Sequence, residues 1–164
     1  MIKSRLIAIF SVLLLITTIV IFIQNRTRKV TPQKPQIDDA KHVLINNQRI
    51  DVEVADTPAL QKQGLSGRDQ IAENHGMLFV FGPEYPPPIF WMKGMLIPID
   101  IIWIRDNEVV KIDEKAEPPP SAFTPDEDLT KYEAPGSIDY VLEVGSGFCQ
   151  RNNIKVGNTI SINL

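Results

Sequence analysis

Hydrophobic positions form one long N-terminal run, followed by a series of short runs separated by turn-forming residues. Residues 6–23 carry no charge, and a helix of that length would span roughly 27 Å, close to the hydrocarbon thickness of a bilayer. The run ends in bulky residues where a signal-peptidase site needs small ones, and no cysteine follows it as in a lipoprotein signal. We therefore predict an uncleaved transmembrane signal anchor over residues 6–23.

Basic residues flank this run on both sides. Lys3 and Arg5 precede it and three basic residues follow it, so the positive-inside rule is nearly balanced. We expect residues 1–5 to stay in the cytoplasm and the rest of the protein to lie on the extracytoplasmic side, as for a common signal anchor. Residues 24–40 contain Pro32 and Pro35 without hydrophobic periodicity, which predicts a flexible linker.

The short runs after residue 40 have the length and spacing of β-strands. Residues 42–45 and 48–54 predict a hairpin around Asn46–Asn47, because asparagine tolerates the positive φ of tight turns. Pro98 divides the apolar stretch 90–104, so we expect one strand near residues 89–93 and another near 99–104. Four further strands are predicted over residues 76–81, 108–112, 138–144 and 159–163.

Two short helices are predicted among these strands. Thr57, Pro58 and Gly64 are suited to the beginning and end of one helix, and residues 147–151 suggest a single helical turn. Residues 114–136 form a proline-rich loop with six acids and two lysines. The pattern therefore predicts a mainly β domain over residues 41–164, an antiparallel sandwich or a partly closed barrel with two short helices, preceded by one transmembrane helix.

The charge of the two parts of the chain limits the classes of partner. Residues 1–40 carry six basic and two acidic side chains, a net charge of +4, whereas residues 41–164 carry eleven basic and eighteen acidic side chains, a net charge of −7. An acidic domain repels phosphate backbones, so nucleic acid is not an expected partner, whereas the basic N-terminal flank suits anionic lipid headgroups. With one cysteine, Cys149, and two dispersed histidines, we expect no intrachain disulfide, metal or cofactor.

Asp100 is the first candidate for chemistry, because it lies between isoleucines in a predicted strand. A buried carboxylate needs a cation, backbone donors or a ligand, so structural, binding and catalytic roles all stay open. Lys93 and Arg68 are the cations we expect nearby, and either could also hold a ligand carboxylate. Trp91 would be core or, if exposed, a surface for a ring-shaped ligand.

Several of these segments together resemble a known family. They are residues 64–68, residues 76–81, residues 90–93 with 98–100, and residues 140–144 with Gly147. The resemblance is to the family called domain of unknown function 192, and it covers about residues 41–164. It implies a compact β-rich fold with short helices, often following a signal or anchor segment, and no established activity.

The chain departs from the family pattern at two places. Members usually continue Trp–Met–Lys–Asn–Thr, but Gly94 and Met95 follow Lys93 here. Many members carry Pro–Cys in the long loop, where this chain has three prolines at 118–120. Because this chain lacks that cysteine, we do not expect thiol-based chemistry.

Three functions are compatible with the sequence. The leading hypothesis is a membrane-anchored, extracytoplasmic, non-catalytic binding or accessory module for a small polar ligand or an envelope partner, with Arg68, Trp91, Lys93 and Asp100 in one polar cleft. The second is a hydrolase-type enzyme with Asp100 as base and Lys93 or Arg68 stabilising negative charge, for which Glu143 could supply a second carboxyl group. The third is a scaffold or assembly protein that uses the acidic loop 114–136.

Overall fold

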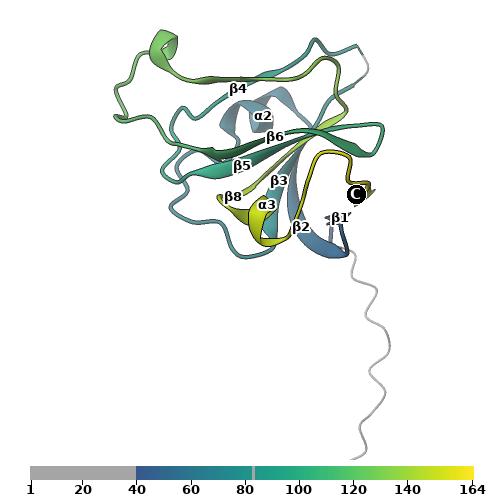
Figure 1. The fold of residues 1–164 in the computed structure, drawn as a ribbon. Helices are drawn as coiled ribbons and strands as arrows, with labels where there is room; N and C mark the ends of the chain where they lie inside the picture. Colours follow the sequence, from purple (N-terminus) through teal and green to yellow (C-terminus); the bar gives the residue numbers. More distant parts are fainter. Residues whose placement is uncertain (1–39, 83) are drawn as a thin grey trace, which may run out of the picture. The chain divides into compact units, whose positions relative to one another are not determined.

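The computed structural model describes residues 40–82 and 84–164, whose main feature is a curled sheet of seven strands (Figure 1). The predicted tail, the predicted anchor over residues 6–23 and the predicted linker up to residue 39 lie outside the described residues. No helix within the described ranges has the length and apolar character needed to span a membrane.

The elements follow the order of strands that the pattern predicted, with short helices between them. In chain order they are β1 (His42–Ile45), β2 (Gln48–Ala55), α2 (Pro58–Gln63), β3 (His75–Val80), β4 (Ile89–Trp91), β5 (Ile99–Arg105), β6 (Glu108–Ala116), the 3₁₀ helix η1 (Asp126–Asp128), β7 (Lys131–Glu133), β8 (Tyr140–Gly145), α3 (Phe148–Arg151) and β9 (Ile160–Asn163). The large sheet has the order β6–β5–β8–β3–β2–β1–β9, and β4 pairs with β7 in a separate two-stranded sheet.

The prediction of a partly closed barrel is confirmed, and that of a purely antiparallel sheet is wrong. β2 and β3 run parallel, because the chain crosses back through α2 and a loop between them. The sheet curls until its outer strands β6 and β9 approach each other at one end. There an isolated bridge joins Glu108 to Thr159, and the Val109 N–H donates to the Asn158 carbonyl at 3.0 Å. The fold is a half-barrel and not a sandwich of two packed sheets.

The predicted tight turn at Asn46–Asn47 is present, and a second turn of the same kind joins β5 to β6. Asn46 and Asn47, between β1 and β2, have φ values of 51° and 63°. Asp106 and Asn107, between β5 and β6, have φ values of 52° and 59°. Two successive residues with positive φ match the right-handed twist of the flanking strands, which explains why both hairpins form at these sites.

The ends of α2 also agree with the prediction. The Thr57 side chain accepts a hydrogen bond from the Leu60 N–H at 3.3 Å, and Pro58 is the first helical residue. Gly64 ends the helix with a φ of 49°, and its N–H donates to the Leu60 carbonyl at 2.8 Å. These contacts fix the loop after α2, which forms part of the site described below.

Both faces of the central strands are buried, which explains their continuous apolar sequences. On the α3 face, residues such as Leu78, Ile102 and Leu142 pack with Phe148 and Cys149 of α3. On the opposite face, which we call the β4–β7 face, the chain buries a second cluster that is covered by the two-stranded sheet. This cluster includes Met77, Phe79, Ile101, Trp103 and Val141, with Phe90 of β4 and Tyr132 of β7 packed against it.

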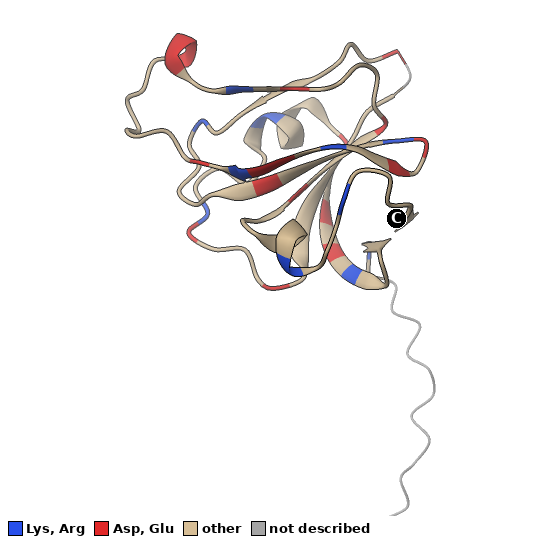
Figure 2. Ribbon diagram, in the orientation of Figure 1, with Lys and Arg blue, Asp and Glu red and all other residues tan. Residues whose placement is uncertain are grey.

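The predicted loop 114–136 contains more regular structure than expected. β6 continues to Ala116, η1 forms at residues 126–128, and β7 pairs with β4, with Tyr132 opposite Phe90. β7 has only three residues, and charged residues stand on both sides of Tyr132, so no hydrophobic period marks it in the sequence. Figure 2 shows the acidic turn of η1 at the tip of the remaining loop.

Candidate ligand-binding site

Asp100 lies in the interior of the protein, where it accepts hydrogen bonds from three backbone N–H groups. Its side chain has no exposed surface. Oδ1 accepts hydrogen bonds from the N–H groups of Lys115 and Gly147, both at 3.0 Å, and Oδ2 accepts one from the Cys149 N–H at 2.9 Å. The carboxylate thus joins the end of β6 to the beginning of α3, which is a structural role.

The geometry of β5 and β6 explains this arrangement. Their register shifts between Ile99 and Ile101, so that Glu114 and Lys115 of β6 both lie opposite Asp100. Lys115 adopts a φ of 55°, and its N–H turns to the Asp100 carboxylate instead of the ladder. A β-bulge leaves a backbone donor without its usual partner, and Asp100 supplies the acceptor.

Cys149 lies next to this carboxylate and is completely buried. Burial raises the pKa of the Cys149 thiol well above its ordinary range, and the negative charge of Asp100 raises that pKa further. The thiol therefore stays protonated, and a nucleophilic role, which requires the thiolate, is disfavoured.

Arg68 does not approach Asp100 but forms an ion pair with Glu53 of β2. Its guanidinium donates two hydrogen bonds to the carboxylate, Nη1 to Oε1 at 2.5 Å and Nη2 to Oε2 at 2.8 Å. The bond from Arg68 lowers the pKa of the Glu53 carboxyl, and the same pair raises the pKa of Arg68. The pair ties the loop after α2 to the sheet.

We expect the Arg68–Glu53 pair to contribute little to stability. The side chains of Arg68 and Glu53 are 37% and 59% exposed, and water screens such a pair. Urea unfolding of Arg68→Ala, Glu53→Ala and the double variant should give a coupling energy below about 1 kcal/mol. A coupling of about 3 kcal/mol or more, the range of buried pairs, would contradict this expectation.

A cavity of about 200 Å³ opens between the end of α2 and strand β4, and we call it the α2–β4 cavity. The loop after α2, the end of β3, strand β4 with the residues after it, and one residue of β8 surround it. Its lining residues are Gln61, Lys62, Gln63, Gly64, Leu65, Ser66, Phe79, Phe81, Pro88, Ile89, Phe90, Trp91, Lys93, Met95 and Glu143. Two of the four predicted site residues, Trp91 and Lys93, are therefore brought together here, and Arg68 and Asp100 are not among the lining residues.

Hydrogen bonds between two loops shape one side of this cavity. The Ser66 hydroxyl donates to the Lys93 carbonyl at 3.0 Å, and the Gly67 N–H donates to the Gly94 carbonyl at 2.8 Å. Gly94 has a φ of 72°, and a Cβ there would lie 3.4 Å from the Ser66 Cβ. The contact would be an ordinary one, so the departure at Gly94 falls where the positive φ, and not a lack of space, favours glycine.

Lys93 and Trp91 are half-exposed and already have partners. The Lys93 ammonium lies 2.6 Å from Oδ1 of Asp126, in η1, and 5.9 Å from the centre of the Trp91 ring. Lys131 lies closer to the same ring, at 4.3 Å. Lys93 thus connects the cavity to the acidic loop, and the Trp91 ring contacts cations instead of packing in the core.

Glu143 is the unexpected member of the cavity. It is 6% exposed, lies on β8, and its Oε2 atom has no hydrogen-bond partner among the described residues. The residues beside it on the neighbouring strands are Met77 and Ile101, neither of which can pair with a carboxyl group. Burial raises the pKa of Glu143 to about 8, so the group is mainly protonated at neutral pH.

The sequence suggested Glu143 only as a second carboxyl group for Asp100, and the fold separates these two side chains. Asp100 is paired in register with Val144, whose side chain lies on the α3 face, whereas Glu143 pairs with Ile101 of the β4–β7 face. Asp100 was identified as a candidate because it is a carboxylate within an apolar strand sequence, and Glu143 has the same pattern around it. That pattern could have identified Glu143 from the sequence.

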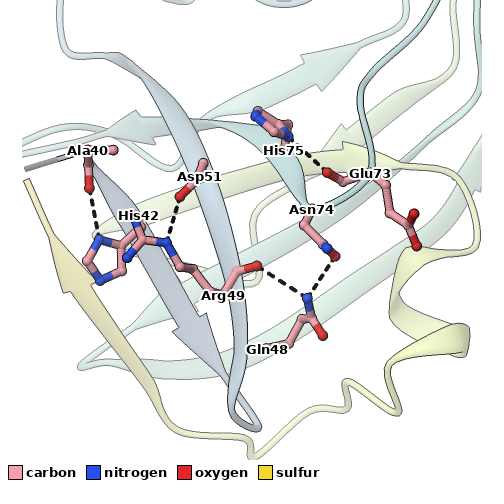
Figure 3. Close-up of polar contacts among 8 residues, drawn as sticks. All are labelled: Ala40, His42, Gln48, Arg49, Asp51, Glu73, Asn74 and His75. Atoms are coloured by element: carbon pink, nitrogen blue, oxygen red, sulfur yellow. Dashed lines mark hydrogen bonds and ion pairs between the residues drawn. The ribbon is translucent and has the colours of Figure 1, made fainter. Parts of the chain in front are cut away.

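Neither histidine is among the lining residues of this cavity. His42 begins β1 and His75 begins β3, on either side of β2 (Figure 3). His42 bonds through Nδ1 to the Ala40 carbonyl and His75 through Nδ1 to the Glu73 carbonyl, both at 2.9 Å. Asp51, between their strands, accepts a hydrogen bond from Arg49 at 2.8 Å. Within residues 40–82 and 84–164, no three His, Cys, Asp or Glu side chains gather in a way that could hold a metal ion.

The fold is that of a mainly β domain, a curled mixed half-barrel, and the α2–β4 cavity lies beside its two-stranded sheet. The chain belongs to the DUF192 family, described as uncharacterized ACR, COG1430, whose model matches residues 41–162. This confirms the resemblance seen in the sequence. No curated protein matches the chain.

Two similar solved structures support the same fold. One is a protein from Sinorhizobium meliloti 1021 described as a candidate transcription regulator, with 29% identity and a TM-score of 0.64, covering 74% of this chain and 92% of that one. The other is a protein of unknown function from Novosphingobium aromaticivorans DSM 12444, with 30% identity and a TM-score of 0.64, covering 73% of this chain and 83% of that one. Neither comparison establishes an activity.

Proposed function

We propose that the domain is a non-catalytic binding module that takes a small polar ligand in the α2–β4 cavity. Residues 6–23 would anchor it in the membrane and place it on the extracytoplasmic side. The observation that carries the proposal is Glu143, a buried carboxyl group in the wall of an open cavity, whose Oε2 atom has no hydrogen-bond partner among the described residues. A buried polar group without a hydrogen bond is costly, and a bound ligand is a means of satisfying it.

The composition of the cavity wall supports a binding site. Aromatic side chains provide the apolar surface on which a small molecule can pack, and a few polar groups at the rim and in the wall can orient it. The contacts that hold the surrounding loops, from Thr57 to Leu60 and from Ser66 to Lys93, preform the cavity without a ligand. A preformed site saves the entropy of ordering these loops on binding.

The hydrolase alternative finds less support in this geometry. Asp100 has no exposed surface, and its two oxygens are occupied by three backbone donors. Glu143 lies on the opposite face of the sheet, so the two carboxyl groups do not form an acid–base pair. The assembly role of the acidic loop 114–136 stays a prediction, with Asp126 as its contact to Lys93.

A ligand screen with a blocked cavity tests the proposal. Thermal unfolding of the full chain would be followed with a panel of small amines, amino acids, sugars and carboxylic acids. A compound present at 100 times its dissociation constant should stabilise the native chain by about 2.7 kcal/mol. Gln63→Trp places a bulky ring at the exposed rim of the cavity and should abolish this effect.

Gln150→Trp is the matched control, because Gln150 is also exposed but lies on α3, outside the cavity lining. This variant should respond to the compounds as the native chain does. Compounds that stabilise the native chain and Gln63→Trp equally would place binding elsewhere, and a panel without any stabilising compound would count against the binding function.

A further inference from the structure

The chemistry of the α2–β4 cavity narrows the class of ligand, and this inference rests on the proposed binding function. Glu143 is the only carboxyl group among its lining residues, all of which are described, and Oε2 is left without a hydrogen bond. A carboxylate in apolar surroundings is best satisfied by a cation that donates hydrogen bonds. An organic ammonium group supplies both the charge and the donors.

The aromatic wall beside Glu143 suits the same group. Phe90 stands at its centre, with its ring centroid 4.9 Å from that of Phe79 and 6.3 Å from that of Phe81. Both partner rings also line the cavity, as does Trp91. Ring faces attract cations, and aromatic cages are a recurrent means of recognising quaternary ammonium ligands.

The rim of the cavity has the opposite charge. Lys62 and Lys93 both line it, and both are exposed. Lys62 forms no ion pair within the described part of the chain, whereas Lys93 is paired with Asp126. An anionic group on the outer end of a ligand would therefore meet Lys62, while a ligand with a cation at its outer end would be repelled.

We propose that the α2–β4 cavity binds a small zwitterion, with its ammonium group against the Glu143 carboxylate and its anionic group at the rim beside Lys62. The apolar part between the two charges packs on the aromatic wall. A volume of about 200 Å³ admits a molecule of the size of a free amino acid. The orientation is fixed by charge, because the inner wall offers a carboxylate and the rim offers ammonium groups.

Binding of this ligand is linked to a proton. Burial raises the pKa of Glu143 to about 8, so an incoming ammonium group displaces a proton from the carboxyl group at neutral pH. The ionised fraction of such a group rises about tenfold per pH unit below its pKa, and the affinity should rise with it. The other charged side chains that line the cavity are those of Lys62 and Lys93. On the same face of the neighbouring strands lie Glu53, which is paired with Arg68, and Asp113, which is paired with Lys111.

Three probes that differ only in their end groups test the proposal by titration calorimetry of the full chain. They are 4-aminobutanoate, a zwitterion; butylamine, a cation; and butanoate, an anion. The expected order of affinity is 4-aminobutanoate, then butylamine, with butanoate weakest. In two buffers of different ionisation enthalpy at pH 7, binding of butylamine should release about one proton, and its affinity should rise about tenfold between pH 6 and pH 7.

Two variants separate the inner from the outer contact. Glu143→Gln keeps the shape of the side chain but cannot ionise, so it should weaken 4-aminobutanoate and butylamine by at least about 30-fold and abolish proton release. Lys62→Gln should weaken 4-aminobutanoate by about threefold and leave butylamine unchanged, as expected for an exposed ion pair. Glu133→Gln, an exposed position on β7, is the matched control and should bind as the native chain does.

Each remaining result overturns the assignment. Equal binding of butylamine by Glu143→Gln and the native chain would show that Glu143 does not hold the ammonium group. Tighter binding of butanoate than of butylamine would contradict the proposed orientation of the ligand in the cavity. If Gln63→Trp also abolishes the binding of butanoate, the cavity is a binding site but the proposed ligand class is wrong. Absence of binding by all three probes also refutes the zwitterion, and the broader ligand screen then decides separately on the binding function.

Discussion

Replacing Asp100 with alanine is expected to destabilise the domain by about 3–5 kcal/mol. The change leaves the N–H groups of Lys115, Gly147 and Cys149 without their acceptor, and an unsatisfied buried donor costs about 1–3 kcal/mol. A domain of this size has a total stability of about 5–15 kcal/mol, so the variant should be close to unfolding. Urea unfolding followed by the fluorescence of the fully buried Trp103 measures the effect.

A graded series distinguishes this role from a general effect of mutation. Asp100→Asn retains one acceptor oxygen but presents an NH₂ group to a backbone N–H, so its cost should be intermediate, at about 2 kcal/mol. Asp69→Ala, at an exposed position, should change stability by less than about 0.5 kcal/mol. If Asp100→Ala were as stable as Asp69→Ala, the three backbone bonds would not hold β6 and α3 together.

Asp100 also shows what the sequence could and could not predict. Its burial followed from its place between isoleucines, whereas its partners come from residues 115, 147 and 149 and meet only in the folded chain. The sequence suggested Arg68 or Lys93 as the partner, because a cation is the common answer to a buried carboxylate. A bulge and a helix start supplied neutral donors instead, and the two cations paired with Glu53 and Asp126.

The predictions of the fold that were correct depend on adjacent residues, whereas those that were wrong depend on contacts between residues far apart in the chain. Hairpin turns, helix ends and the division at Pro98 depend on a few adjacent residues, and the structure confirms them. The parallel pairing of β2 with β3 depends on where the chain returns after α2, which no local pattern specifies. β7 escaped prediction for a related reason, since a three-residue strand forms only because β4 offers an edge.

Glu143 should destabilise the ligand-free domain, increasingly as the pH rises. Burial raises the pKa of Glu143 from 4.5 to about 8 in the folded chain. Below pH 4.5 the carboxyl group is protonated in both states and its ionisation costs nothing. Between the two values the unfolded chain loses the proton first, so stability falls with rising pH and levels off above pH 8. The full loss is on the order of 5 kcal/mol.

Glu143→Met removes this cost, because methionine has a similar length and no charge to desolvate. Relative to the native chain, the variant should gain on the order of 4 kcal/mol more at pH 8.5 than at pH 5 in urea unfolding without ligand. All other titrating groups are common to both chains. The pH dependence of the difference in their free energies of unfolding therefore reports the ionisation of Glu143. A difference independent of pH would mean that the carboxyl group ionises normally in the folded state. A gain in stability combined with loss of ammonium binding would show that the chain retains Glu143 for its ligand and not for its fold.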